Sequence, residues 1–324
     1  MSRYDARMRA CLMVEGQENV SWEQWCALAD ACEASGLDGL FRSDHYLSTI
    51  GSESRGTLDA WTTLAGLAAR TKRIRLGTLV SPVTFRHPAV LAKSAATVDH
   101  ISGGRVELGI GAGWNEREHA AYGFPFPELR VRMEMLAEQV EIVHRLWTEG
   151  HVRFEGRQYQ LEDCTALPRP VQRPRPPLIL GGAAGPRSVA LAVRFADEYN
   201  TFLASDDEVR ARRARVLEGC RRAGRAPSTL AFSLMTAALI GRDREEIRAL
   251  ARLVLRRFDE PDGDPDALIE RRADTWIIGT PEETVTRLRE LEKLGVERIY
   301  LQHLAHESVE MVSLVGAEVA PAVS

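Results

Sequence analysis

The sequence contains no long apolar run, and this absence argues against a membrane-spanning helix. A span needs about 18 consecutive apolar residues, and no stretch of the chain reaches that length. The first residues, MSRYDARMRA, have no apolar core, so we expect no secretory signal peptide there.

Cysteine is scarce. The chain has 5 cysteines among 324 residues, an odd number with no CxxC pair, so a disulfide framework is not expected. No Cys/His cluster has the spacing of zinc ligands, and we expect no metal site. Reduced thiols in a cytoplasmic protein fit best. The five residues are Cys11, Cys26, Cys32, Cys164 and Cys220.

A strong excess of one charge is also missing. The net charge is −4, so no broad basic face is implied and nucleic acid is not expected as a partner. The Arg-rich run 210–225 contains Val216 and Leu217 at helical spacing, which indicates a solvated helix face. A GxGxxG dinucleotide-binding motif is absent as well.

What the sequence does contain is an alternation of strands and helices, clearest in residues 73–126. The apolar run 74–80 stops at Ser81-Pro82, and the run 105–114 ends in spaced glycines. Between them, 88–100 has apolar residues at helical spacing and begins with a proline. This order is a βαβ unit, and such units build parallel sheets.

The whole chain repeats this alternation about eight times, which predicts one (β/α)₈ barrel domain over 1–324. An open doubly wound sheet is the alternative. A β-hairpin is expected at 151–161, and an exposed insertion is expected near 259–274, which begins acidic and rich in Pro and Gly. The expected strands are 9–14, 36–45, 74–80, 105–114, 178–182, 196–203, 230–240, 275–278 and 298–304.

In a barrel, function lies at the C-terminal ends of the strands. Asp44 and His45 end the second expected strand, where a His can donate a proton, bind a ring or contact substrate. The alternative is a structural pair, with Asp44 capping the loop and His45 packed beneath it. Glu116 and Glu118 follow the fourth strand, and for Glu116 a solvated helix start is the better interpretation.

Two glycine-rich turns are candidate cofactor sites. Glycines at 109, 111 and 113 let backbone N–H groups approach a ring or phosphate, although tight packing of small residues explains them equally well. A second turn enters a helix whose N-terminus suits a phosphate, with a ligand-free βα turn as the alternative. Its candidate residues are Gly181, Gly182, Gly185, Arg187 and Ser188.

The motifs LGTLV, FRHPAVLAK, ISGGR and GIGAGWNEREHAAYG, together with the SDH at 43–45, carry a resemblance. As a set, over nearly the whole chain, they resemble the bacterial luciferase-like superfamily and in particular its deazaflavin (coenzyme F-420)-dependent oxidoreductases. This resemblance implies that Asp44 and His45 belong to the cofactor site and that His45 lies by the deazaflavin ring. It also implies that a cis peptide at Leu79–Val80 backs the ring, with an ordinary trans strand end as the alternative. The cofactor pocket would be lined by Gly111, Ala112 and Gly113.

The chain departs from the sugar-phosphate dehydrogenases of this group. They carry a catalytic Glu where this chain has Trp114 and a catalytic Trp in the loop after the DH pair, where this chain has 46–49. Their sugar-oxidising mechanism is therefore not carried over. Candidate substrate contacts at the strand ends are Glu15, Tyr46, Trp114 and His303, although for His303 a buried structural role is the simpler interpretation. Either Gln302 or His303 should point into the barrel mouth, because side chains alternate along a strand.

Three hypotheses follow. The first is an oxidoreductase that uses F-420 for hydride transfer with a small organic substrate. The second is a reduced-FMN-dependent monooxygenase that activates O₂, and the third is a barrel that binds a cofactor without activity. The resemblance also implies a homodimer. Substrate identity would depend on the loop 48–56 and on the insertion near 259–274.

Overall fold

The computed structural model describes residues 8–52 and 54–323. Within these residues eight parallel strands close into a barrel, which confirms the (β/α)₈ prediction. Each strand pairs with the next in the ring and the last pairs with the first. In ring order the strands are β1 (Arg9–Val14), β2 (Gly39–Arg42), β3 (Arg75–Pro82), β4 (Val106–Gly111), β7 (Leu178–Gly181), β8 (Glu198–Phe202), β9 (Ala231–Ile240) and β11 (Arg298–Gln302).

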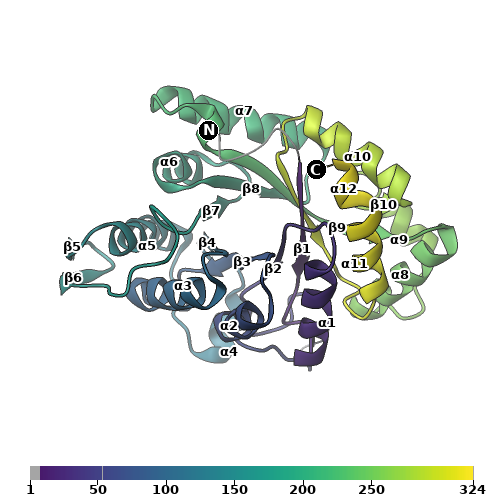
Figure 1. Ribbon diagram of the computed structural model, residues 1–324, viewed down its shortest axis with the longest axis horizontal. Helices are drawn as coiled ribbons and strands as arrows, with labels where there is room; N and C mark the ends of the chain where they lie inside the picture. The colour runs from purple at the N-terminus through teal and green to yellow at the C-terminus, as the bar shows by residue number, and fades with distance from the viewer. Residues whose placement is uncertain (1–7, 53, 324) are drawn as a thin grey trace.

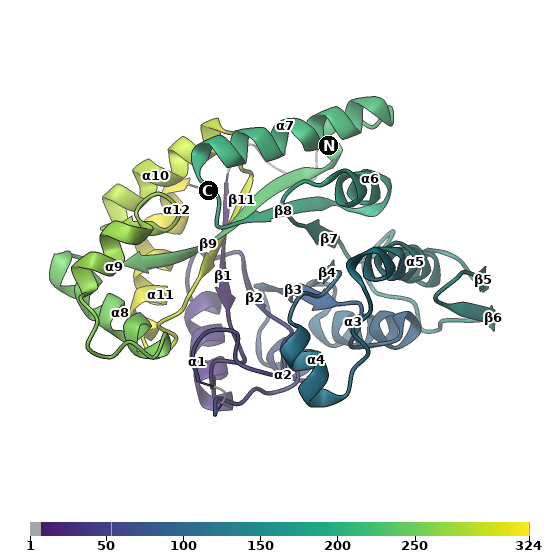
Figure 2. The same cartoon turned by 180° about the vertical axis from the view of Figure 1, so that it is seen from behind.

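Helices surround the barrel, as Figures 1 and 2 show from opposite sides. Helices α1, α7 and α10 begin with capping boxes, in which a Ser or Thr and a residue three positions later satisfy each other's backbone N–H groups. The helices of the outer layer are α1 (Trp22–Glu33), α2 (Ala60–Arg70), α3 (Pro88–Ser102), α5 (Leu129–Thr148), α6 (Pro186–Phe195), α7 (Asp206–Arg222), α8 (Arg244–Arg257), α10 (Pro281–Lys293) and α11 (Val309–Leu314).

Shorter elements complete the chain. Helix α4 (Glu116–Tyr122) follows β4 directly, and a 3-10 turn, η1 (Pro227–Thr229), precedes β9. At the C-terminal end α11 is followed by a π-helical turn, η2 (Val315–Val319), and then by α12 (Ala320–Val323).

The strand expected at 275–278 forms as β10 (Ile277–Gly279), but it lies outside the ring. Strand β9 has 10 residues, and its first part pairs with β8 and β11. Its last three residues, Ala238–Ile240, extend past the barrel and pair with β10. The extra strand therefore lengthens one edge of the barrel and does not widen it.

The expected hairpin is confirmed and runs slightly further than predicted, with β5 (Val152–Glu155) and β6 (Gln160–Cys164) antiparallel. It projects at one end of the molecule beyond α5 (Figure 1). The insertion after α8 begins with exposed residues and then forms a helix that the sequence analysis did not predict, α9 (Pro265–Arg272). This helix packs on α8 and buries Leu268 and Ile269.

Two apolar cores lie on the two sides of the barrel wall. The larger fills the space between strands and helices. The smaller fills the middle of the barrel, and it consists of Cys11, Met13, Phe41, Leu79, Ile179 and Tyr300. A packed interior leaves the strand ends as the place where a ligand can approach.

The N-terminal end of the barrel interior holds a cluster of buried charges. Arg298 is fully buried, and its Nη1 lies 2.6 Å from Glu107 Oε2 and 3.2 Å from Glu198 Oε2. Its guanidinium carbon lies 4.8 Å and 4.9 Å from the ring centroids of Phe41 and Tyr300. Tyr300 donates its hydroxyl to Glu198. We call these five residues the floor cluster.

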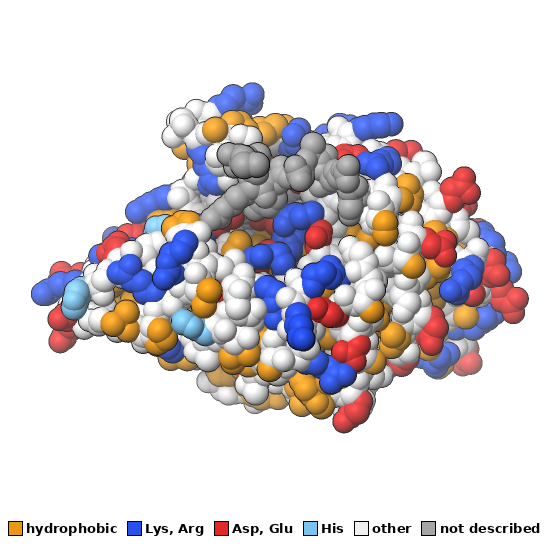
Figure 3. Space-filling model, in the orientation of Figure 1, with side chains coloured by type: hydrophobic (Ala, Val, Ile, Leu, Met, Phe, Trp, Pro, Cys, Tyr) orange, Lys and Arg blue, Asp and Glu red, His pale blue; other side chains and the backbone are white. Residues whose placement is uncertain are grey.

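The five cysteines carry free thiols, as expected. Among the helices of residues 8–52 and 54–323, none is long and apolar enough to cross a membrane. Side chains of both charge signs lie across the face shown in Figure 3, in keeping with the small net charge.

Candidate functional site

The residues singled out from the sequence meet at one rim of the barrel. All eight barrel strands are parallel, so their C-terminal ends share this rim, which we call the mouth. The following candidates lie in or directly after these strand ends: Glu15 (β1), Asp44 and His45 (β2), Leu79 and Val80 (β3), Gly111, Ala112 and Gly113 (β4), Gly181 and Gly182 (β7), and His303 (β11).

His45 is paired with Glu118 across the mouth. Its Nδ1 lies 2.8 Å from Glu118 Oε2, and the side chains of His45 and Glu118 are 13% and 0% exposed. Burial alone would lower the pKa of His45, but the hydrogen bond and the charge of Glu118 outweigh it and raise the pKa above its ordinary value. Burial likewise opposes ionisation of Glu118, yet its hydrogen bonds lower the pKa of that carboxyl.

Helix α4 brings Glu118 to this position. Asn115 caps the helix and accepts a hydrogen bond from the backbone N–H of Glu118. The carboxylate of Glu118 then accepts hydrogen bonds from the backbone N–H groups of Tyr46 and Leu47. Glu116 on the same turn is exposed, as expected. Glu118 was visible in the sequence, but its partner lies 73 residues away, so spacing alone could not show the pair.

Asp44 joins the ends of neighbouring strands. It is buried, and its Oδ2 accepts hydrogen bonds from Ser81 Oγ at 2.7 Å and from Arg86 Nη1 at 2.6 Å. Arg86 also binds Asp59, and although burial opposes its charge, the nearby carboxylates raise the pKa of Arg86. This geometry anchors the loop after β2, so a contact between Asp44 and a cofactor stays a prediction.

Tyr46 packs into an aromatic cluster next to this anchor. Its ring centroid lies 5.1 Å from those of Phe85 and Tyr122, and its hydroxyl accepts a hydrogen bond from Arg86. Burial raises the pKa of Tyr46 to about 12, so it is a neutral phenol. The structure thus gives Tyr46 a packing role, and its contact with a substrate stays a prediction.

Strand β3 has a bulge at the mouth. The Leu79–Val80 peptide bond is cis, as the resemblance implied, and the pairing with β4 shifts between Thr78 and Ser81. A Cβ at Gly111 would lie 2.7 Å from Val80 Cγ2. Glycine at 111 is therefore required by packing against the bulge, which is the alternative that the sequence left open. Whether the backbone at 111–113 also contacts a ring stays a prediction.

A chain of polar side chains links three strand ends. Gln302 Nε2 donates to Glu15 Oε1 at 2.5 Å, and Gln17 Nε2 donates to Glu15 Oε2 at 2.8 Å. Ser43 Oγ donates to Gln17 Oε1 at 2.6 Å. From the sequence, Gln17 was placed after the first strand without a role, and Gln302 and His303 were alternatives for the inward position. The contact with Glu15 identifies Gln302 as the inward one.

His303 lies on the other side of β11. It is 1% exposed, and its Nε2 lies 3.0 Å from the carbonyl oxygen of Ser308. Burial lowers the pKa of His303 to about 4, so its imidazole is neutral. This matches the structural interpretation of His303, and a substrate contact for it stays a prediction that the geometry does not favour.

The turn after β7 presents the N-terminus of α6. Gly185 is the N-cap residue, and no side-chain cap bond occurs there within the described residues. Ser188 Oγ donates to the Gly185 carbonyl and lies 2.9 Å from Tyr199 Oη, while Arg187 is exposed. Gly182 has φ +144°, which favours glycine. An exposed helix N-terminus with an adjacent Arg suits an anion.

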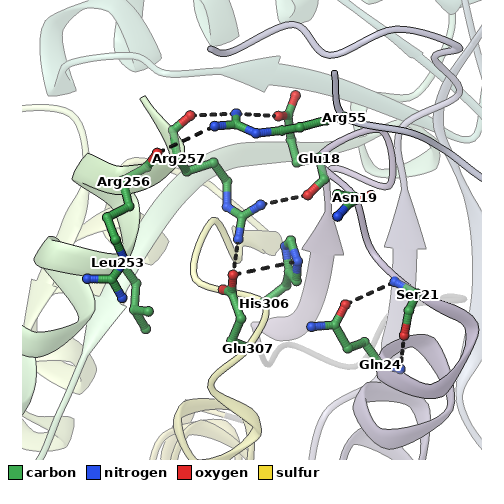
Figure 4. Close-up of a pocket in the computed structure, with 10 residues that line it drawn as sticks. All are labelled: Glu18, Asn19, Ser21, Gln24, Arg55, Leu253, Arg256, Arg257, His306 and Glu307. Atoms are coloured by element: carbon green, nitrogen blue, oxygen red, sulfur yellow. Dashed lines mark hydrogen bonds and ion pairs between the residues drawn. The ribbon is translucent and has the colours of Figure 1, made fainter. Parts of the chain in front are cut away.

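The loop 48–56 contacts the end of α8, as Figure 4 shows for Arg55 beside Arg256 and Arg257, and it also contacts the start of the insertion that follows. Arg55 Nη1 lies 3.0 Å from Glu18 Oε2 and donates to the carbonyl oxygen of Arg257, while its Nη2 lies 2.8 Å from Asp259. Glu18 is fully buried and accepts hydrogen bonds from Ser48 and Thr49. We call Arg55 and the three residues that it binds, Glu18, Arg257 and Asp259, the loop clamp. It borders a cleft of about 480 Å³ whose lining includes none of the strand-end candidates.

Comparison with known proteins places this architecture. The profile of the luciferase-like monooxygenase family matches residues 9–298. The chain belongs to this family. An F-420-dependent glucose-6-phosphate dehydrogenase of Nakamurella multipartita is 32% identical over 318 residues, which cover 91% of this chain and 90% of that protein.

Solved structures agree with this membership. A monooxygenase from Streptomyces bottropensis superposes with a TM-score of 0.82 at 26% identity and covers 97% of this chain and 99% of that one. The coenzyme F-420-dependent tetrahydromethanopterin reductase of Methanopyrus kandleri superposes with a TM-score of 0.81 at 21% identity and covers 98% and 100%, which supports the fold alone. The protein is a luciferase-like oxidoreductase.

Proposed function

We propose that this luciferase-like protein binds the deazaflavin coenzyme F-420 at the barrel mouth and exchanges a hydride between it and a small organic substrate. The observation that carries the proposal is the 32% identity to an F-420-dependent dehydrogenase over 91% of the chain. A sugar phosphate is not proposed as substrate, because Trp114 and the residues 46–49 depart from the sugar-phosphate dehydrogenase pattern described above.

The residues at the mouth fit such a cofactor. Three large apolar side chains are exposed at strand ends where barrel proteins bind ligands, namely Trp114 (63%), Phe202 (45%) and Leu203 (41%). Apolar surface of this kind suits a flat tricyclic ring. The exposed N-terminus of α6, with Arg187 beside it, suits the phosphate of the same molecule.

The proposed roles of the protein side chains are binding, orientation and proton handling. When bound, a deazaflavin supplies the two-electron chemistry. Val80 and Gly111 would support the ring from the β3–β4 side, and Trp114 would cover part of the mouth. His45 is our candidate catalytic residue, because its side chain is partly exposed at the mouth and only its Nδ1 is hydrogen-bonded within the described residues.

A second candidate function keeps the fold and changes the chemistry. The 26% identity to a monooxygenase favours oxygenation as the alternative reaction, and for it we propose reduced FMN as the cofactor that activates O₂. Both cofactors carry a tricyclic ring and a phosphate, so the same glycines and the same α6 N-terminus fit either one. A barrel without activity is less favoured, because His45 keeps both a buried carboxylate partner and an unbonded Nε2.

The first experiment is titration of the purified protein with F-420 and with FMN, each oxidised and reduced. We expect F-420 to bind at least tenfold more tightly, about 1.4 kcal/mol. The reverse order would reject the F-420 proposal and direct the work to O₂ consumption. Failure of all four ligands to bind would favour the inactive barrel.

A homodimer is also proposed, on the strength of the resemblance alone. Sedimentation at several protein concentrations would distinguish a dimer from a monomer.

A further inference from the structure

The pairing of His45 with Glu118 determines which protons the imidazole carries. The Glu118 carboxylate is fully buried, and its donors are Nδ1 of His45 and the backbone N–H groups of Tyr46 and Leu47. A buried carboxylate needs a compensating positive charge. Of its donors, only the imidazole can supply that charge, by remaining protonated on both nitrogens.

The other charged groups around His45 act in the same direction or are already engaged. Glu15 on β1 and Asp44 on β2 both favour a positive imidazole. The guanidinium of Arg86 is bound to Asp44 and to Asp59. No positive side chain therefore opposes protonation of His45 at short range among the groups that influence its pKa.

The second nitrogen of the ring is free to act. Nδ1 is occupied by Glu118, while Nε2 has no hydrogen bond within the described residues and the side chain is 13% exposed. The ring also lies edge-on to exposed Trp114, with 5.7 Å between centroids. A protonated His45 thus presents Nε2–H toward the mouth.

A base for removing a proton from a substrate is harder to find at this rim. The two oxygens of Glu15 are bound by the amides of Gln17 and Gln302. Asp44 accepts from Ser81 and Arg86, and Glu118 is fully enclosed. Each carboxylate around His45 is therefore engaged, whereas a proton donor is exposed.

From this geometry we propose that Glu118 is a positioning residue that holds His45 as a proton donor, which fits the site to reduction of a carbonyl, imine or conjugated double bond. The proposal rests on the proposed function, and it adds the direction of the reaction and the class of substrate. Oxidation of an alcohol would need the opposite arrangement, a free base at the same place.

One carbon of the C=O, C=N or C=C bond would gain a hydride, which is two electrons and one proton, from a bound reduced deazaflavin, and the deazaflavin would be left oxidised by two electrons. The other atom of the double bond gains the proton from Nε2, whose N–H bond breaks as the new bond forms. His45 is left as a neutral imidazole, still hydrogen-bonded to Glu118, and regains its proton from solvent.

The test is the titration of His45 in the protein without cofactor, followed by NMR of ring-labelled histidine. The His45→Gln variant assigns the signal by removing it. In the unmodified protein we expect the titration midpoint of His45 to lie above the ordinary value of about 6.5, because the bond to the Glu118 carboxylate favours the protonated ring. In Glu118→Gln, which keeps the size and one acceptor oxygen, we expect the midpoint to fall below 6.5, because burial then dominates.

The matched control is Glu116→Gln, which removes an exposed carboxylate from the same helical turn and should leave the midpoint unchanged. In a second readout, diethylpyrocarbonate modifies neutral, accessible imidazole. At pH 7 we expect His45 in Glu118→Gln to react at least tenfold faster than in the unmodified protein, as measured by mass spectrometry of the peptide.

Two results would overturn the inference. One is a neutral His45 at pH 7 in the unmodified protein, and the other is reduction of oxidised F-420 with glucose 6-phosphate as the probe. These outcomes are distinct from failure of the proposed function. If F-420 does not bind while His45 titrates as expected, the proposed cofactor is rejected and the role of Glu118 is retained. If F-420 binds and His45 is neutral, the role of Glu118 is rejected and the proposed cofactor is retained.

Discussion

The floor cluster and the His45–Glu118 pair are both ionic groups inside the same barrel, yet they differ in how completely they are enclosed. In the floor cluster Arg298, Glu107 and Glu198 are each at most 2% exposed. At the mouth Glu118 is equally buried, but its partner His45 is partly exposed and has one nitrogen without a bond. A ligand can reach the second pair and cannot reach the first.

This difference separates stability from chemistry along the barrel axis. Arg298 holds the pKa of Glu107 down at about 2 despite the burial that opposes ionisation, so Glu107 stays ionised over the physiological range. The charges of the floor cluster pair with one another and leave none for a substrate. The mouth pair instead keeps one proton available, which is what a reacting group needs.

Removing the arginine of the floor cluster should have the largest effect on stability. Arg298→Met would leave Glu107 and Glu198 buried without their shared cation, and we expect a loss of about 3–5 kcal/mol in the free energy of unfolding, measured by urea denaturation. If this variant does not fold, Glu107→Gln tests the same cluster with less disruption. In the folded fraction F-420 affinity should stay unchanged.

The control for this substitution is Arg70→Met. Arg70 pairs with Asp30 on the surface, where both side chains are about half exposed. Surface ion pairs contribute little, so the unfolding midpoint should barely move. Equal losses in the free energy of unfolding for Arg298→Met and Arg70→Met would show that the floor cluster contributes no more to stability than a surface ion pair.

The next effect concerns the loop clamp at the rim. Arg55→Ala removes bonds to Glu18, to the Arg257 carbonyl and to Asp259. Hydrogen bonds to charged groups contribute about 1.5–3 kcal/mol, so we expect a loss in that range. Hydrogen exchange should rise in 48–56 and near 259, while the floor strands stay protected. Uniform exchange across the barrel would contradict a local clamp.

The contrast also explains what the sequence could predict. The barrel and the hairpin follow from local patterns of apolar residues, and each was expected close to its observed bounds. Glu107–Arg298 and His45–Glu118 join residues 191 and 73 positions apart. Such pairs depend on which strands and helices become neighbours, and no local pattern contains that information.

Two smaller differences have a local cause. Gln302 and His303 are adjacent in one strand, and a shift of one residue exchanges the inward and outward positions. The sequence therefore named both, and the bond from Gln302 to Glu15 decided between them. At Gly111 the reason for glycine is contact with Val80, which depends on a bulge in the neighbouring strand.

The pH dependence of stability should distinguish His303 from His45. Burial lowers the pKa of His303 to about 4, so between pH 6.5 and 4 the unfolded chain binds a proton that the folded protein does not. Stability therefore falls as the pH falls through this window, by about 2 kcal/mol between pH 7 and 5 for one such histidine. His303→Gln should remove that part of the loss.

His45 acts in the opposite sense. Its pKa is raised, so its pair with Glu118 contributes stability that is fully present below about pH 6.5 and is lost as the pH rises through the raised pKa. Urea denaturation midpoints measured from pH 5 to 9 would show both effects, the loss of stability at acidic pH from His303 and the loss at alkaline pH from His45. His151→Gln, which changes a surface histidine, is the control. An unchanged acid limb in His303→Gln would show that this histidine is not held neutral.

The smallest effect should come from replacing Trp114 at the mouth. This change should weaken cofactor binding without changing stability, whereas Arg298→Met in the floor cluster should do the opposite. The indole is 63% exposed, so Trp114→Ala should leave the free energy of unfolding nearly unchanged. A contact between its ring and a deazaflavin would contribute about 1 kcal/mol, which predicts F-420 binding weaker by about fivefold in a fluorescence titration. Trp22→Ala removes an indole that is 40% exposed on α1 and should leave F-420 affinity unchanged. An unaltered affinity in Trp114→Ala would mean that the ring binds elsewhere on the mouth, since this side chain rests against His45 and has no other aromatic partner within the described residues.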